Sequence, residues 1–167
     1  GAILDLVRTV ELQPEDARAW FQLGAPRQAR GDRPGAVADY DRAIAIRPDH
    51  VEALCNRALA RRYLGDSEGA TLDYDRAIAA DGAHGMAWNG RGSVRRDQGD
   101  LAGALEDFET ATRVQPEVWQ AWGNRGAVLA ALGRRDEAAL SFDEALRRVP
   151  AAFRPAAENQ RREALGE

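Results

Sequence analysis

The chain has 167 residues, of which 44% are hydrophobic and 30% charged, with a formal net charge of -4 and a single cysteine, Cys55. This composition excludes a disordered tail, the lack of a long apolar run excludes a membrane span, and a lone cysteine excludes a disulfide scaffold. The acidic balance argues against a general nucleic-acid binder. The 23 basic residues are all arginine, which is typical of GC-rich bacterial coding. We expect a bacterial domain or small repeat array, cytoplasmic by default because no signal peptide is recognisable.

A 34-residue repeat runs through the sequence without insertion or deletion. Shifting the chain by one repeat length aligns four turn glycines, Gly31, Gly65, Gly99 and Gly133. The same shift aligns four aromatic residues, Tyr40, Tyr74, Phe108 and Phe142. A fixed period of this length is the sequence signature of a repeat array, in which each unit stacks on its neighbours.

The repeat begins before its first complete copy. Ala2, Leu6 and Pro14 stand one repeat length before the matching residues of the first complete repeat, so residues 1–14 are expected to form the second helix of a truncated repeat. The four complete repeats then span 17–50, 51–84, 85–118 and 119–152. We expect the chain to be a piece of a longer protein.

Each complete repeat is predicted to form two helices. Between Val51 and Leu64, apolar and small residues recur at helical spacing, and Gly65 suits the left-handed conformation that ends a helix. Asp66 and Ser67 can cap the second helix of the same repeat. Such a hairpin cannot bury its apolar face alone, so neighbouring repeats must stack. Residues 153–167 are predicted to form a polar capping helix.

The residues that recur in each repeat carry a family resemblance. In the first repeat they are Trp20, Leu23, Gly24, Ala36, Tyr40, Ala43 and Pro48. Their order and spacing resemble the tetratricopeptide repeat, and the resemblance covers all four complete repeats. It implies an all-α fold, an α-solenoid in which stacked antiparallel helix pairs form a right-handed superhelix.

Charged residues recur at two positions of the repeat. Arginine stands at the seventh position of three repeats, as Arg57, Arg91 and Arg125, and an aspartate precedes each of them at a constant spacing, in the second helix of the repeat before. A charge on a packing face needs a partner. In the family that the chain resembles, a second helix packs against the next first helix. We therefore expect the inter-repeat pairs Arg57–Asp39, Arg91–Asp73 and Arg125–Asp107. Pairing within a repeat fits less well, since Arg125 would then face Ser141.

The resemblance also implies that a partner binds the concave face formed by the first helices. The candidate groove residues are Phe21, Gln22, Asn56, Arg62, Tyr63, Asn89, Arg96, Gln120, Asn124 and Arg161. The three asparagines could donate to and accept from the backbone of an extended peptide. Equally, these amides could cap local backbone or face water. The excess of arginine on this face favours an acidic or C-terminal peptide.

The sequence holds no recognisable catalytic chemistry. It lacks a glycine-rich phosphate loop, a nucleophile elbow and an H-E-x-x-H motif, and His50 and His84 are too few for a metal site. We expect no enzyme activity, no cofactor and no metal.

The predicted function is a protein–protein interaction scaffold with a protein or peptide partner, without nucleic acid or membrane insertion. Self-assembly into homo-oligomers through the exposed end of the helix at 1–14 stays open as an alternative. RNA binding has less support, because the chain is acidic and its groove is poor in aromatic residues.

Overall fold

The structure is a computed structural model, and it describes residues 2–166. Over these residues it contains α-helices and one 3-10 turn, with no strand, and no helix long and apolar enough to cross a membrane. The helices of the N-terminal half are α1 (Ala2–Leu12), α2 (Ala17–Ala29), α3 (Arg33–Ile46), α4 (Val51–Tyr63) and α5 (Ser67–Ala80). Those of the C-terminal half are α6 (Gly85–Asp97), α7 (Leu101–Val114), α8 (Trp119–Ala131), α9 (Arg135–Arg148), the 3-10 turn η1 (Ala151–Phe153) and α10 (Arg154–Leu165). The boundary between the halves falls between Gly82 and Ala83, and each half is a compact unit.

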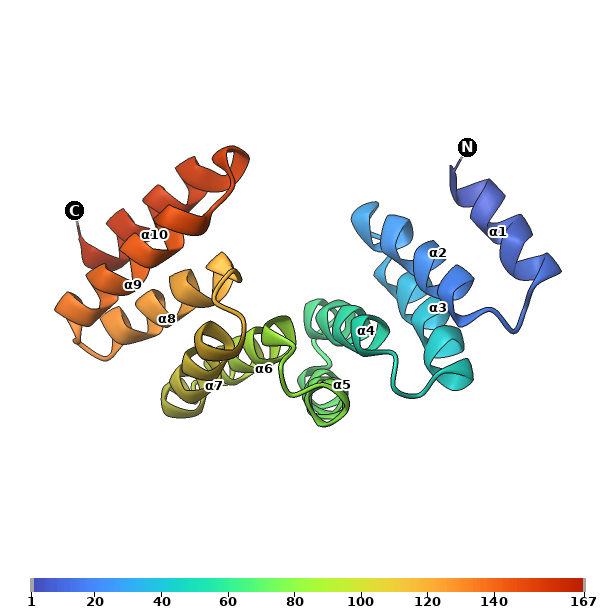
Figure 1. Ribbon diagram of the computed structural model, residues 1–167, viewed down its shortest axis with the longest axis horizontal. Helices are drawn as coiled ribbons and strands as arrows, with labels where there is room; N and C mark the ends of the chain where they lie inside the picture. Colours follow the sequence, from blue (N-terminus) through green and yellow to red (C-terminus); the bar gives the residue numbers. More distant parts are fainter. Residues whose placement is uncertain (1, 167) are drawn as a thin grey trace. The chain divides into compact units, whose positions relative to one another are not determined.

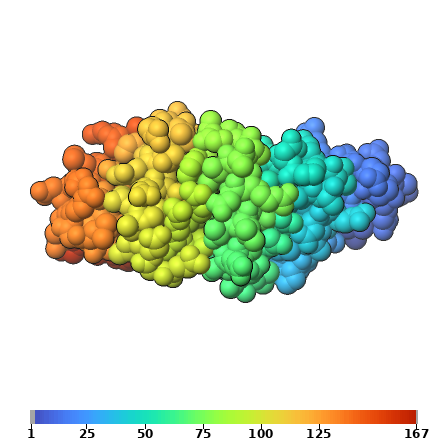
Figure 2. Space-filling view, turned by 90° about the horizontal axis from the view of Figure 1, so that it is seen from below, coloured from blue at the N-terminus to red at the C-terminus, as the bar shows by residue number. Residues whose placement is uncertain are grey.

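Antiparallel helix pairs make up each half. In the N-terminal half α2 pairs with α3 and α4 with α5, and in the C-terminal half α6 pairs with α7 and α8 with α9 (Figure 1). The space-filling view shows side chains filling the spaces between the ribbons within each half (Figure 2). The expected all-α helical repeat fold is thereby confirmed.

The turn inside each pair follows from the glycine and aspartate that the sequence repeats. Gly65 has a φ of 85°, in the left-handed region where a side chain would be strained, and it ends α4. The carboxylate of Asp66 accepts a hydrogen bond from the backbone N–H of Gly69 at 2.8 Å and so caps α5. Gly31 and Gly99 adopt the same conformation in their turns. The predicted cap is therefore correct.

The core of each half lies between its helices. In the C-terminal half, Phe108, Phe142 and Leu129 are fully buried and share one cluster with Leu165 of α10. The last helix therefore covers the apolar face of the last pair, as a capping helix does. In the N-terminal half, α1 lays Val10 and its neighbouring apolar residues against α2.

The predicted inter-repeat ion pairs within each half are wrong. Arg57 donates from Nε to Oδ2 of Asp73 at 2.8 Å, and Asp73 lies on the second helix of the same repeat. Its contact with the preceding repeat goes to Asp41 and not to Asp39. Asp39 instead accepts both of its hydrogen bonds from Arg27, at 2.8 and 2.9 Å.

The C-terminal half shows the same arrangement. Asp107 accepts hydrogen bonds from Arg91 within its own repeat, at 3.0 and 2.7 Å. Arg125 donates to Ser141 of its own repeat and to Glu109 of the repeat before it, so Asp107 is not its partner. The remaining predicted pair, Arg91–Asp73, would join the two halves and stays a prediction.

Hairpin geometry explains these partners. The seventh and eleventh residues of a repeat lie one turn apart on the first helix, and both face the carboxylate on the second helix of the same pair. Asp73 thus binds Arg57 and Arg61, with Arg61 at 2.8 Å. In the last repeat, Leu129 replaces the eleventh-position arginine, and Ser141 replaces the aspartate. In the first repeat, Leu23 replaces the seventh-position arginine, yet Asp39 is kept and pairs with Arg27 alone.

Candidate ligand-binding surface between α2 and α4

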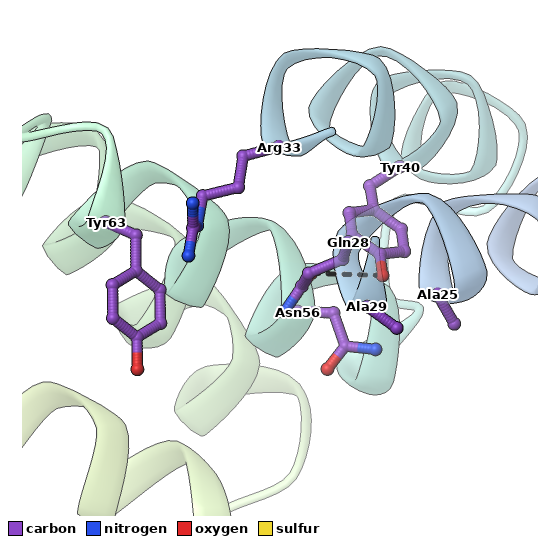
Figure 3. Close-up of a pocket in the computed structure, with 7 residues that line it drawn as sticks. All are labelled: Ala25, Gln28, Ala29, Arg33, Tyr40, Asn56 and Tyr63. Carbon is purple, nitrogen blue, oxygen red and sulfur yellow. Dashed lines mark hydrogen bonds between the residues drawn. The ribbon is translucent and has the colours of Figure 1, made fainter. Parts of the chain in front are cut away.

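Two cavities lie on the surface between α2 and α4, the first helices of the N-terminal half. The first cavity, here the Tyr63 cavity, has a volume of about 320 Å³. Its lining residues are Ala25, Gln28, Ala29, Arg33, Tyr40, Asn56 and Tyr63. Figure 3 shows these residues, with Asn56 and Tyr63 coming from α4 and Gln28 from α2. Two of the predicted groove residues, Asn56 and Tyr63, therefore lie in one cavity.

The Tyr63 cavity combines an arginine with aromatic and polar groups. The guanidinium of Arg33 lies over the Tyr63 ring, 4.9 Å from its centroid, and the guanidinium of Arg62 lies 5.8 Å from the same centroid. The Tyr40 hydroxyl donates to Oε1 of Gln28 at 3.2 Å (Figure 3). Burial raises the pKa of Tyr40 to about 12, while the neighbouring Asn56 amide acts in the opposite direction. The cavity wall therefore carries positive charge from Arg33, and Tyr40 is neutral.

The second cavity, here the His50 cavity, also has a volume of about 320 Å³. Its lining residues are Arg18, Phe21, Gln22, Arg47, His50 and Glu52. Two further predicted groove residues, Phe21 and Gln22, belong to it. Both cavities draw residues from α2, with the His50 cavity nearer the start of that helix and the Tyr63 cavity nearer its end.

His50 is fixed within its cavity and stays neutral near pH 7. Its ring lies 4.9 Å from the Phe21 ring, and its Nδ1 lies 3.0 Å from Oε2 of Glu52. Burial lowers the pKa of His50, and the Arg47 charge lowers it further, against the opposing effect of Glu52. With Glu52 ionised, the contact favours the tautomer whose hydrogen sits on Nδ1. The histidine therefore orients a carboxylate and contributes no charge of its own.

Three arginines of these cavities have no carboxylate partner within the described residues. Among the described residues, the side chains of Arg18, Arg33 and Arg47 form no ion pair and no hydrogen bond. Arg18 and Arg47 are exposed, and Arg33 is half-buried against Tyr63. Guanidinium groups offer several N–H donors in a planar fork that matches a carboxylate. Arg18 and Arg47 can therefore bind an anion without breaking a contact of the fold, whereas Arg33 contacts the Tyr63 ring.

The predicted amides of the C-terminal half bind one another. Asn124 donates from Nδ2 to Oδ1 of Asn89 at 2.9 Å, and its own Oδ1 accepts from Arg96 at 3.1 Å. Asn89 is buried, with 7% of its surface exposed. The two asparagines neither cap local backbone nor face water alone. They form a chain of hydrogen bonds that ends at the Nδ2 group of Asn89.

The remaining predicted groove residues of the C-terminal half lie apart from that chain. Gln120 is half-buried near the start of α8. Arg161 lines a smaller cavity of about 260 Å³ together with Leu146, Glu158 and Arg162, and its Nε lies 3.5 Å from Oδ1 of Asp143. Arg161 therefore already faces a carboxylate of its own half.

Sequence reasoning missed Arg33, which lines the Tyr63 cavity. Arg33 begins the second helix of its repeat, whereas the groove prediction considered positions of first helices alone. Arg18 occupies a groove position in the repeat, and Arg47 follows the end of α3. The signal that could have found them is the absence of a carboxylate at a pairing distance along the helix.

Comparison with known proteins bears on the family and the fold. A family model for the tetratricopeptide repeat matches residues 55–107 and 90–153, which together cover more than half of the chain. A search of curated protein sequences gave no match.

Solved structures of low sequence identity share the fold. The crystal structure of MamA is 23% identical, with a TM-score of 0.76 over 89% of this chain and 86% of that chain. YrrB, a TPR protein with an unusual peptide-binding site, is 20% identical, with a TM-score of 0.70 over 96% of this chain and 87% of that chain. The first TPR of Spaghetti (RPAP3), bound to the HSP90 peptide SRMEEVD, is 23% identical, with a TM-score of 0.66 over 70% of this chain and 93% of that chain.

Proposed function

Because the chain belongs to the tetratricopeptide repeat family, we propose that it is a protein-interaction module that holds an extended segment of a partner protein. The segment lies on the surface between α2 and α4. Two structural relatives, YrrB and the first TPR of Spaghetti, have a peptide-binding site or a bound peptide. The observation that carries the proposal is the pair of cavities on one surface, both lined by polar side chains with spare hydrogen-bonding capacity.

The chemistry of the surface suits an extended backbone. Asn56 is half-buried on the wall of the Tyr63 cavity and presents an amide that can donate to a peptide C=O and accept from a peptide N–H. Tyr63 is 61% exposed and offers an aromatic face together with a hydroxyl group. A partner segment gains apolar contact from Tyr63 and Phe21 and orientation from the amide. Neither side chain carries out chemistry, so binding itself is the function.

A peptide library tests this proposal. Random 12-residue segments displayed on phage are selected against the whole chain, and the selected sequences are then titrated against purified variants. We expect Asn56→Ala and Tyr63→Ala each to weaken the selected peptides by about tenfold, the effect of losing one good contact. The control is Leu72→Ala on α5, an exposed apolar residue outside both cavities, which keeps the affinity. Selected peptides that bind all three variants equally would refute the α2–α4 site.

Self-assembly through α1 has less support. Ile3, Leu6 and Val7 already pack against α2, while Leu4 and Leu12 stay exposed at 70% and 73%. Two isolated leucines make a small apolar surface compared with a stable dimer interface. Light scattering over a hundredfold range of concentration checks this alternative, since assembly predicts a growing mass that Leu4→Ser abolishes.

A further inference from the structure

Three aromatic rings form a row that joins the two cavities between α2 and α4. The centroid of the His50 ring lies 4.9 Å from that of Phe21, and the Phe21 centroid lies 6.1 Å from that of Tyr40. His50 and Phe21 line the His50 cavity, whereas Tyr40 lines the Tyr63 cavity. The shape of this surface therefore depends on where the His50 ring lies.

Of these three rings, only His50 can gain a charge in mildly acidic solution. We propose that the surface between α2 and α4 releases its partner segment as the pH falls from 7.5 to 5, because the protonated His50 ring leaves its place against Phe21. This inference rests on the proposed function and adds its regulation. A histidine in water titrates near pH 6.5, inside that range. Tyr40 stays neutral throughout, since burial raises its pKa to about 12.

The place that His50 occupies suits a neutral ring. His50 is 5% exposed and stands at the start of α4, where the helix dipole disfavours a cation. Burial lowers the pKa of His50, and the Arg47 charge lowers it further. A ring in water therefore takes up a proton at a higher pH than the buried ring does. The buried position is at its most stable above pH 6.5 and loses stability as the pH falls below that value.

The charged groups around the ring add up to a positive balance. They are Arg18 of α2, Arg47 and Asp49 of the turn before α4, Glu52 of α4, and Arg76 of α5, which donates to the carbonyl oxygen of Pro48 in that turn at 3.1 Å. Glu52 and Asp49 attract a proton to the ring, against three arginines. The Glu52 side chain is 58% exposed, so water screens its attraction for a protonated ring. Its contact with Nδ1 is therefore too weak to keep a cation in the cavity.

Withdrawal of the His50 ring removes one wall of the cavity and one of the two ring contacts of the half-buried Phe21. A histidine ring in water is about 10% protonated at pH 7.5 and about 97% protonated at pH 5.0. Relative to a buried ring that stays neutral, the exposed position therefore gains up to about thirtyfold in population. Since the partner segment binds the arrangement with the ring inside, its affinity should fall by between about threefold and thirtyfold.

Fluorescence anisotropy at pH 7.5 and pH 5.0 tests the proposal. The probes are peptides from the phage selection that contain no histidine, aspartate or glutamate, acetylated and amidated so that they carry no titrating group of their own. We expect the wild type to bind them at least about threefold more weakly at pH 5.0. His50→Gln should bind with the same affinity at both pH values, because its side chain cannot be protonated.

Two control variants isolate His50. His84→Gln changes the other histidine, which stands at the same position one repeat later. Asp39→Asn removes a carboxyl group that titrates in the same range, since burial raises its pKa to about 6. Both variants should keep the full response to pH. Circular dichroism at both pH values verifies that every variant is folded.

Nuclear magnetic resonance of the free chain checks the motion without any ligand. The ring signals of Phe21 should shift along the same titration curve as those of His50. Affinity that differs less than twofold between the two pH values, a response that His50→Gln retains, or Phe21 signals that ignore the His50 titration would overturn this inference. In each of these cases tight binding at pH 7.5 that depends on Asn56 leaves the proposed function intact. A selection that yields no binder refutes the proposed function, and the release of a partner with it.

Discussion

Replacing Asp73 by alanine perturbs the most buried charge cluster of the chain. The Asp73 side chain is 2% exposed, and it accepts hydrogen bonds from Arg57 and Arg61, whose side chains are 9% and 25% exposed. The substitution leaves both guanidinium groups facing a cavity. Arg57 keeps Asp41, which is half exposed, and Arg61 keeps Asp66 at 3.7 Å.

The expected cost follows from the burial of the uncompensated charge. Removing one partner of a buried ion pair destabilises proteins by about 3–5 kcal/mol, and the remaining contacts of Arg57 put this case near about 3 kcal/mol. For a chain of this size, such a loss lowers the melting temperature by about 6–12 °C. Urea unfolding followed by far-ultraviolet circular dichroism measures the free energy of unfolding of the whole chain.

The last repeat supplies the control. Ser141 stands where the other repeats have aspartate, and Ser141→Ala removes a neutral hydrogen-bond acceptor from Arg125, which keeps Glu109. Ser141→Ala should lower the free energy of unfolding by about 1 kcal/mol. The double variant Arg57→Met with Asp73→Ala should recover part of the loss, because it removes the stranded charge along with its partner. If Asp73→Ala costs no more than Ser141→Ala, the carboxylate does not hold the helix pair together.

Two further substitutions test the packing of the first repeat. Burial raises the pKa of Asp39 to about 6 from its ordinary 3.8, against the pull of Arg27, so the folded chain takes up a proton before the unfolded chain does. The stability of the wild type relative to Asp39→Asn should therefore rise as the pH falls from 7 to 4 in urea titrations, and a constant difference would contradict the assignment. A Cβ atom on Gly24 would lie 2.5 Å from Cε1 of the buried Tyr40, so Gly24→Ala should cost about 1–3 kcal/mol in thermal melts. Gly82→Ala, whose Cβ meets only ordinary contact at 3.7 Å, is the control.

The helices and their turns could be predicted from local chemistry. Gly65 and Asp66 act within one turn of backbone, so their residue types alone specify a left-handed end and a capped start. The ion pairs could not be predicted in the same way. The spacing between Asp39 and Arg57 is compatible with contact between repeats, but the side chains of one hairpin lie nearer. The sequence does contain one indication of pairing within a repeat. In the last repeat, Leu129 replaces the eleventh-position arginine and Ser141 replaces the aspartate, so both members of a pair change together.

The candidate site was partly accessible to sequence reasoning. Asn56 and Tyr63 occupy first-helix positions that face a ligand in the family that the sequence resembles, and both line one cavity. Arg33 belongs to a second helix, and only the packing of α3 against α2 and α4 brings it beside Tyr63. Likewise, the bond between Asn124 and Asn89 depends on the stacking of α6 and α8, which residue types alone do not specify.

Side-chain amide signals in nuclear magnetic resonance spectra test most directly whether a partner segment lies between α2 and α4. An unlabelled peptide selected from the phage library is titrated into the ¹⁵N-labelled chain, with a scrambled version of the same peptide as the control. We expect the side-chain amide signals of Gln28 and Asn56 to shift, together with backbone signals along α2 and α4. Unchanged Gln28 and Asn56 signals, with shifts confined to α5 or to the C-terminal half, would contradict it.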